Sequence, residues 1–494
     1  MITTMFPASL AGLLLAVLLV LPAAAASTRP NVLFIASDDL RTDLACYGNM
    51  QVKTPNLDAL ARRGRLFERA YVQLTVCNPS RASIMTGLRP DTIKVWDLQT
   101  HFRAARPDAV TLPQHFKNNG YTAIGIGKIF HNQGKKVPSQ GPFPDPVSWS
   151  APPVFANGAH WQDWVMPDGK SPPRKQEAMQ CLDVPDNAYF DGKIADAAVA
   201  KLAELKAAGQ PFFLAVGFWK PHLPFNAPKK YWDLYDRAKI APPDPGQMPA
   251  GAPAMAWHNS EELRSYGGIP RQGPISPKLA AELRHGYYAG ISFLDAQVGR
   301  VVAELDRLGL AENTVIVFWS DHGFQLGEHD MWGKSSNYEL DARAPLIIAA
   351  PGLKQPGVAA PGLVEFIDIY PTVAGLCGLT PPAGLQGQSL LPLLRDPHGP
   401  GKPAVLTQHA RPYFNDEFTH MGYSLRTPQY RYVEWREIAS GAVVARELYD
   451  EQADPRETVN RAGEAAQAGL IERLSTQTHE LIGENPRILP LSVR

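Results

Sequence analysis

This chain has few cysteines, no net charge and few long apolar runs. Its 494 residues include four cysteines, Cys46, Cys77, Cys181 and Cys377, which are too few and too scattered for a disulfide framework or a Cys-x-x-Cys metal site. Lysine plus arginine equals aspartate plus glutamate at 48 each, so the charge balance gives no reason to expect a nucleic acid as partner. With 45% hydrophobic and 19% charged residues, 40 Gly and 46 Pro, the composition excludes disordered and fibrous proteins.

One short apolar run lies near the N-terminus. The first 26 residues carry no charge, and residues 10–21 are apolar and precede Pro22 and four alanines. This run is too short to span a bilayer, and the small residues after it fit a signal cleavage site. We therefore expect residues 1–26 to be a secretory signal peptide and the mature protein to be periplasmic or secreted, without stable membrane insertion. The missing basic segment leaves an interfacial or uncleaved anchor as the alternative.

Strand and helix patterns alternate along most of the chain. Four apolar segments have the character of buried strands, at residues 31–35, 121–126, 212–216 and 314–319. Helical patterns occur between them, clearest at 55–63 and 277–308. The sequence therefore predicts an α/β fold with a central mixed, mostly parallel sheet flanked by helices, whose ligands bind at the carboxyl ends of the strands.

The pattern changes past about residue 400. Short antiparallel strands are predicted at residues 423–427, 431–435 and 447–450, with a helix at 465–482. We expect residues 27–400 to form the main domain and 401–494 a smaller C-terminal α+β subdomain with an antiparallel sheet. Residues 132–190 and 219–277 are rich in Pro, Gly and Trp, which predicts long loops over one face of the main sheet.

Polar side chains follow the predicted strands. Asp38 and Asp39 come after the first strand, and Asp321 and His322 after the last. Carboxylates gathered at one sheet edge repel each other unless a cation lies between them, and oxygen-rich ligands suit calcium or magnesium. The sequence therefore predicts a divalent-cation site, with calcium favoured over magnesium. Taken alone, paired acids are also typical of a solvated turn or a helix start.

The most specific motif is residues 77–87, which read CNPSRASIMTG. It matches the sulfatase signature C-x-P-S-R followed by T-G. A helix beginning just after Cys77 would place this side chain at the positive end of the helix dipole, where an anion is stabilised. A structural cysteine beside a helix start is the alternative, and the number of matched positions argues against it.

Further motifs extend this resemblance over nearly the whole chain after residue 26. They occur in the family's order at residues 31–39, 54–58, 127–131, 220–222, 320–328, 334 and 343–346. The chain therefore resembles the formylglycine-dependent sulfatases of the alkaline phosphatase-like superfamily. Residues 89–92, 213–225 and 424–435 most resemble the iduronate 2-sulfatase-like enzymes.

The resemblance implies a mechanism in which Cys77 is oxidised to formylglycine by a maturation enzyme. One hydroxyl of the hydrated aldehyde would attack sulfur with Asp321 accepting its proton, and the other would then expel sulfate. The implied metal ligands are Asp38, Asp39, Cys77, Asp321 and His322. Arg81, Lys128 and Lys334 would bind the sulfuryl oxygens, His222 together with Lys334 would protonate the leaving alcohol, and His131 would assist elimination.

We therefore expect a sulfuric ester hydrolase that acts on a sulfated carbohydrate, with 2-O-sulfated uronic acid as the leading substrate. Arg103 or Arg343 would bind the uronate carboxylate. The alternatives are a phosphate or phosphonate monoester hydrolase of the same superfamily and a non-catalytic protein that binds sulfated glycans.

Two smaller expectations concern the loops and the remaining cysteines. Tryptophans in the loops either stack on sugar rings or pack within the loops, and they are Trp149, Trp161, Trp164 and Trp219. With Cys77 reserved for chemistry, the other three cysteines allow at most one disulfide.

Overall fold

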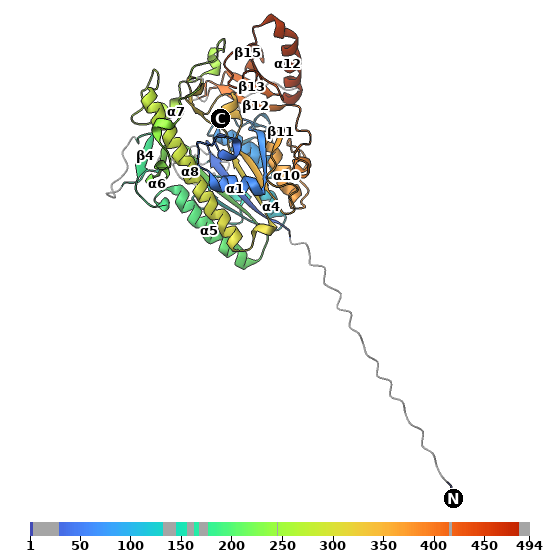
Figure 1. Ribbon diagram of the computed structural model, residues 1–494. Helices are drawn as coiled ribbons and strands as arrows, with labels where there is room; N and C mark the ends of the chain where they lie inside the picture. The colour runs from blue at the N-terminus through green and yellow to red at the C-terminus, as the bar shows by residue number, and fades with distance from the viewer. Residues whose placement is uncertain are drawn as a thin grey trace.

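The structure is a computed structural model that describes residues 1–2 and 29–483, except 132–144, 156–162, 167–175, 245 and 414–416. A seven-stranded sheet with helices on both faces forms the larger part, and a four-stranded sheet lies beside it (Figure 1). Most of the predicted signal peptide falls outside the described residues. None of the described helices combines the length and hydrophobicity that a membrane span requires.

The central sheet has the strand order β11-β2-β10-β7-β1-β5-β3. Its strands are β1 (Asn31–Asp38), β2 (Arg65–Tyr71), β3 (Thr122–Gly127), β5 (Phe212–Pro221), β7 (Thr314–Ser320), β10 (Leu346–Ala349) and β11 (Ala360–Glu365). β1 pairs in parallel with β5 and β7, and β3 pairs in parallel with β5. β10 runs antiparallel to β7 and β2. The predicted mixed, mostly parallel sheet is confirmed, and the four predicted strands are its neighbours β7, β1, β5 and β3.

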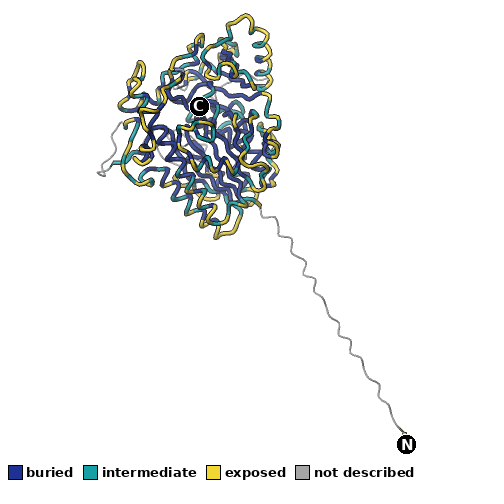
Figure 2. The backbone as a smooth tube through the Cα atoms, viewed as in Figure 1, coloured by how far each residue is buried: buried dark blue, intermediate teal, exposed yellow. Residues whose placement is uncertain are grey.

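Helices bury both faces of this sheet. They are α1 (Pro55–Arg63), α2 (Cys77–Thr86), α3 (Pro90–Ile93), α4 (Leu112–Asn118), α5 (Phe190–Ala208), α8 (Pro277–Arg307), α10 (Ile369–Leu376) and α11 (Leu391–Arg395). In β1, Leu33 and Ile35 pack with α1, α5 and α8, whereas Val32 and Phe34 face α2, α4 and α10. Burial on both faces explains the continuous apolar runs of the strands. Figure 2 shows this buried interior beneath a more exposed outer layer.

The first turn of α1 is stabilised by a residue far away in the sequence. Asp295 of α8 accepts hydrogen bonds from the backbone N–H groups of Asn56 at 3.1 Å and Leu57 at 2.7 Å. These are N–H groups that a helix cannot satisfy internally. The Asp295 carboxylate therefore caps α1 and fixes it against α8.

A second sheet is built from the C-terminal part of the chain. It is antiparallel and consists of β12 (Val405–Arg411), β13 (His420–Arg426), β14 (Tyr430–Glu437) and β15 (Val443–Asp450), with α12 (Ala468–Ile482) packed on it. The predicted antiparallel sheet is confirmed, although the sequence patterns did not reveal β12. The division of the chain at residue 401 stays a prediction.

The stretches predicted as long loops contain short elements. These are β4 (Met179–Leu182), β6 (Phe225–Pro228), α6 (Lys229–Trp232) and α7 (Glu261–Arg264), and the later segments β8 (Gln325–Leu326), β9 (Trp332–Gly333) and α9 (Glu339–Ala342) are equally short. Trp219 is buried within β5, and Trp149 is buried beside Phe130, so neither is exposed for stacking on a sugar. Trp164 is half-buried, and Trp161 lies outside the described residues.

Candidate active site

Two neighbouring parallel strands deliver acidic residues to one edge of the central sheet. β1 ends at Asp38 and is followed by Asp39, while Asp321 and His322 follow β7. The strands pair in register, so these residues emerge side by side. All four are completely buried. The predicted clustering of polar groups at the strand ends is therefore present.

The backbone of Asp39 adopts an unusual conformation. Its φ of 62° lies in the left-handed region, which is costly for residues other than glycine. Two contacts hold it there: its N–H donates to Asp321 Oδ1 at 3.1 Å, and its carbonyl accepts from the Tyr287 hydroxyl of α8 at 2.6 Å. This conformation directs the Asp39 carboxylate toward the other polar groups.

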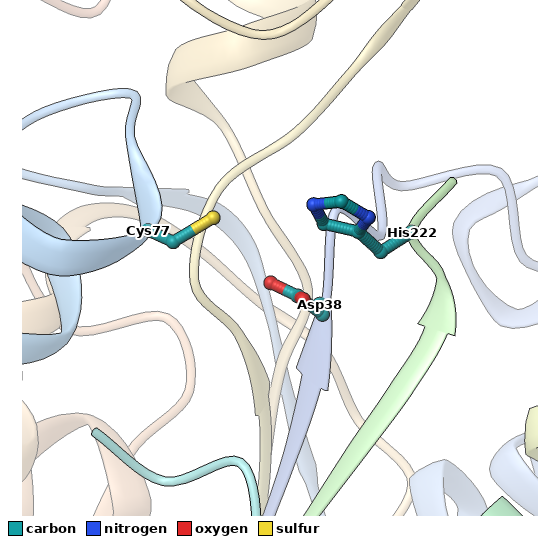
Figure 3. Close-up of side chains that lie close together, drawn as sticks. All are labelled: Asp38, Cys77 and His222. Carbon is teal, nitrogen blue, oxygen red and sulfur yellow. The ribbon is translucent and has the colours of Figure 1, made fainter. Parts of the chain in front are cut away.

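Cys77 is the first residue of α2 and is buried among these groups. Its Sγ lies 3.3 Å from His322 Nε2 and 3.9 Å from Asp39 Oδ1. Figure 3 shows the side chains of Cys77 and His222 pointing toward each other above the carboxylate of Asp38. Burial raises the pKa of the Cys77 thiol well above its ordinary value. The unmodified side chain is therefore a neutral thiol, which is a weak nucleophile.

The donor set fits a hard divalent cation. Ligand atoms of Asp38, Asp39 and Asp321 lie within 4.8 Å of one another, as do those of Asp39, Cys77 and His322. His322 Nδ1 lies 2.9 Å from the Gly323 carbonyl, so the ring donates there and leaves the Nε2 lone pair facing the cluster. Burial, with a contribution from Asp38, raises the pKa of Asp39. A cation at this position would favour the ionised carboxylate.

Arg81 of α2 is completely buried between the acidic residues. Nε donates to Asp321 Oδ2 at 2.8 Å, and Nη2 donates to Asp38 Oδ1 at 3.2 Å. The remaining contacts are to the backbone carbonyls of Ser37, Lys128 and Ile129. All five N–H donors of the guanidinium are thereby used. This differs from the expectation that Arg81 binds the sulfuryl oxygens, because its donors face the carboxylates and the backbone.

Lys128 follows β3 and is buried against β1. Its Nζ donates to Asp38 Oδ2 at 2.5 Å. Burial would raise the pKa of Asp38, but the charges of Lys128, His222 and Arg81 hold it well below its usual range. The pKa of Lys128 is raised because Asp38 outweighs the effect of burial. This pair is therefore ionised.

Lys334 and His222 lie close to each other and to Glu262, a residue that sequence patterns did not indicate. Lys334 Nζ lies 2.9 Å from Asp39 Oδ2, 3.1 Å from His222 Nε2 and 2.7 Å from Glu262 Oε2. Glu262 Oε1 in turn lies 3.2 Å from His222 Nε2. Glu262 belongs to α7, within the stretch predicted as a loop. No motif marks it, because its role depends on tertiary contacts alone.

His131 is buried beside this charged cluster. Among the described residues, neither of its ring nitrogens has a hydrogen-bond partner. Burial, together with the charge of Lys128, lowers the pKa of His131 well below its ordinary value, so the ring is neutral.

The two arginines expected to bind a uronate carboxylate have other partners. Arg103 forms a bidentate pair with Asp145 at 2.5 and 2.8 Å. Arg343 donates to the carbonyl of Glu68 at 2.7 Å and packs over the ring of Tyr47. Both contacts are structural, which corrects that expectation. The cysteines in the described part of the chain are all free thiols, so none of them forms the single disulfide that the count allowed.

Comparison with known families agrees with this geometry. Residues 30–379 match the family model described as Sulfatase, and residues 327–484 match the model described as N-sulphoglucosamine sulphohydrolase, C-terminal. The chain belongs to the sulfatase family. It is therefore a sulfuric ester hydrolase, and the alternative of a non-catalytic binding protein is set aside.

Individual relatives and solved structures are similar to this chain over most of their length. Human iduronate 2-sulfatase is 34% identical over 515 residues, covering 90% of this chain and 93% of the relative, which confirms the predicted resemblance. A protein solved in complex with its substrate D-glucosamine-2-N,6-O-disulfate gives a TM-score of 0.73 at 23% identity, covering 93% and 99% of the two chains. A phosphonate monoester hydrolase of Agrobacterium radiobacter gives 0.75 at 24% identity, covering 92% and 95%. The two structural matches establish the fold, and the predicted alkaline phosphatase-like α/β fold class is confirmed.

Proposed function

We propose that this sulfatase is an exported enzyme that hydrolyses sulfate esters of carbohydrates, with a terminal 2-O-sulfated uronic acid of a sulfated glycan as its substrate. The observation that carries the proposal is the burial of Cys77 between His322, Asp39 and a set of cationic side chains. A sulfate ester is an anion, and buried cations stabilise the charge that develops on its oxygens. The 34% identity to human iduronate 2-sulfatase supports the choice of a uronate.

We assign the nucleophile to formylglycine derived from Cys77 by a maturation enzyme. The hydrated aldehyde supplies two hydroxyls on one carbon, one to attack sulfur and one to expel sulfate. Serine would instead leave a stable sulfate ester, and cysteine an S-sulfo adduct, because neither carries a second hydroxyl on the same carbon that could expel the group. The high pKa of the buried thiol is consistent with a requirement for conversion.

We assign the cation site to calcium, with magnesium as the second candidate. Asp38, Asp39, Asp321 and His322 would hold the ion together with the group at position 77. The bound ion supplies positive charge beside the nucleophile and the sulfuryl oxygens. Arg81 orients two of these carboxylates through its guanidinium.

The remaining side chains divide between the sulfuryl group and the leaving alcohol. Lys128 and Lys334 present ammonium groups to the sulfuryl oxygens. His222 faces Cys77 across the site (Figure 3), the side from which an alcohol departs in an in-line displacement, and with Lys334 it protonates that alcohol. Asp321 accepts the proton of the attacking hydroxyl. We assign His131, which is buried beside the charged cluster, to assist elimination of sulfate.

Two measurements test this proposal on protein from a host that contains the maturation enzyme. Peptide mass spectrometry should find formylglycine at position 77, and Cys77→Ser should abolish turnover or become trapped as a sulfate ester. Cys181→Ser, at an exposed cysteine, is the matched control and should retain full activity. Full activity of protein with an unmodified Cys77 thiol would contradict the mechanism.

A panel of defined sulfated disaccharides and a matched pair of aryl sulfate and aryl phosphate esters tests the substrate. We expect release of sulfate from 2-O-sulfated uronate to be fastest. Preference for a 6-O-sulfated hexosamine would contradict the uronate assignment alone. Faster hydrolysis of the aryl phosphate would instead support the phosphate or phosphonate monoesterase.

A further inference from the structure

We propose that Glu262 is a positioning residue that holds His222 and Lys334 on the leaving-group side of the site. The inference rests on the proposed function, since it uses the role of these two side chains as proton donors. Each oxygen of the Glu262 carboxylate has its own partner: Oε2 lies 2.7 Å from Lys334 Nζ, and Oε1 lies 3.2 Å from His222 Nε2. One carboxylate therefore fixes the separation of the two groups.

The contacts of Lys334 define the direction of its ammonium group. Its Nζ donates to the carboxylates of Asp39 and Glu262 at 2.9 and 2.7 Å, which leaves one of the three ammonium N–H donors for the substrate. His222 Nδ1 lies 2.7 Å from the Leu223 carbonyl and donates there, so when His222 acts as the acid its Nε2 carries the proton and Glu262 Oε1, 3.2 Å away, accepts it until substrate binds. Removal of the Glu262 charge would leave Lys334 with one strong partner, Asp39, and would draw it away from the leaving group.

The segment that carries Glu262 is itself fixed to the segment that carries Lys334. The Trp332 N–H donates to Ser260 Oγ at 2.8 Å. Arg411 of β12 joins the same two segments, because it donates to the Met255 carbonyl at 2.9 Å and to the Ser335 carbonyl at 2.7 Å. The carboxylate is therefore held in place before substrate binds, as a positioning group requires.

Glu262 lies at the outer side of the site, since its side chain is more exposed than those of the two residues it contacts. Its side chain is 23% exposed, compared with 8% for Lys334 and 2% for His222. Its two oxygens contact His222 and Lys334, so we assign it the role of holding these donors and not that of a donor itself. Its effect on the reaction must pass through the two donors that it holds.

The experiment compares Glu262→Gln with Glu261→Gln across a series of aryl sulfates from 4-nitrophenyl sulfate to phenyl sulfate. Glu261 is the matched control, since it precedes Glu262 in α7 and is exposed, with His258 3.8 Å away. A poor leaving group needs proton donation, which contributes about 10²- to 10⁴-fold, whereas nitrophenolate needs little. We expect Glu262→Gln to lose about 100-fold in kcat on phenyl sulfate and under about 10-fold on 4-nitrophenyl sulfate. Glu261→Gln should follow the wild type.

The outcomes separate this inference from the proposed function. Equal losses on all aryl sulfates, or no loss on any, would overturn the role of Glu262 while the wild type remains active. A wild type that releases sulfate neither from these esters nor from any sulfated disaccharide of the panel would overturn the proposed function and this inference with it. Glu262→Asp keeps the charge, so it should recover part of the phenyl sulfate activity, and it supplies the same test where the glutamine variant does not fold.

Discussion

Replacing Arg81 by lysine should weaken calcium binding far more than it weakens binding of sulfate. The guanidinium donates to two proposed ligands of the ion, Asp321 Oδ2 at 2.8 Å and Asp38 Oδ1 at 3.2 Å, and is completely buried. Lysine keeps the charge but carries its donors on a single nitrogen, so it cannot span both carboxylates and the backbone carbonyls. The ligands of Arg81→Lys therefore lose their fixed orientation.

The size of this effect follows from the two carboxylates that the guanidinium orients. Groups that orient metal ligands contribute about 10- to 100-fold to metal affinity, or about 1.4 to 2.7 kcal/mol. Arg81 orients two ligands at once, so we expect a loss near the upper end of this range. The protein should remain folded, since lysine retains the positive charge that two buried carboxylates require.

Calorimetric titration of chelator-treated enzyme with calcium measures this affinity directly. Arg65→Lys is the control, because Arg65 is also completely buried but donates to backbone carbonyls, including those of Lys354, Gln355 and Leu394, and to none of the proposed metal ligands. Unchanged calcium affinity in Arg81→Lys, together with weaker competitive inhibition by sulfate, would refute the reasoning. Arg81 would then act on the sulfuryl group, as the family resemblance implies.

Two further predictions concern catalysis and stability. Lys128→Ala removes an ammonium that faces the sulfuryl group, and kcat on 4-nitrophenyl sulfate should fall by about 10²- to 10³-fold; a loss under about fivefold would contradict this role. Because burial raises the pKa of Asp295 to about 6, the native state binds that proton more tightly than the unfolded state. The free energy of unfolding of the wild type should therefore fall relative to that of Asp295→Asn as the pH rises from about 4 to about 6. Above about pH 6 the difference between the two proteins should stay constant. Urea midpoints of both proteins check this, and a constant difference across that window would count against it.

The main sheet was predictable because its strands are buried on both faces. A strand with two buried faces reads as an unbroken apolar run, and the four such runs became β1, β3, β5 and β7. The helix at residues 55–63 was predicted at its observed bounds, since Pro55 and Gly64 mark its ends. Strand ends then located Asp38, Asp39, Asp321 and His322, because parallel strands bring their carboxyl ends to one edge.

Other parts of the site depend on contacts that sequence patterns do not record. Glu262 lies in a stretch without periodicity, and its importance appears only when α7 is placed beside Lys334. Arg103 was a plausible partner for a carboxylate until the fold placed Asp145 beside it. The same applies to Arg81, whose motif position indicates the site but whose five donors can be assigned only from the surrounding backbone.

The two sides of the site differ in what supports them. The proposed metal ligands stand at the ends of β1 and β7, which are rigid because both faces of the sheet are packed. The segment of Lys334 is held both by Thr75, which exchanges hydrogen bonds with Ser335 and Ser336 at 3.2 and 2.8 Å, and by the C-terminal sheet. Arg411 binds the Ser335 carbonyl at 2.7 Å, and Asn337 donates to the Gly422 carbonyl at 3.3 Å.

Lys334 couples its segment to both sides of the site. Its Nζ lies 2.9 Å from Asp39 Oδ2, beside the proposed metal ligands, and 3.1 Å from His222 Nε2, on the proposed leaving-group side. One ammonium group therefore links the proposed cation site to the proposed proton donor. The motif at residues 77–87 indicates the reaction, whereas sugar binding is a property of loop side chains, where single-sequence patterns carry the least information.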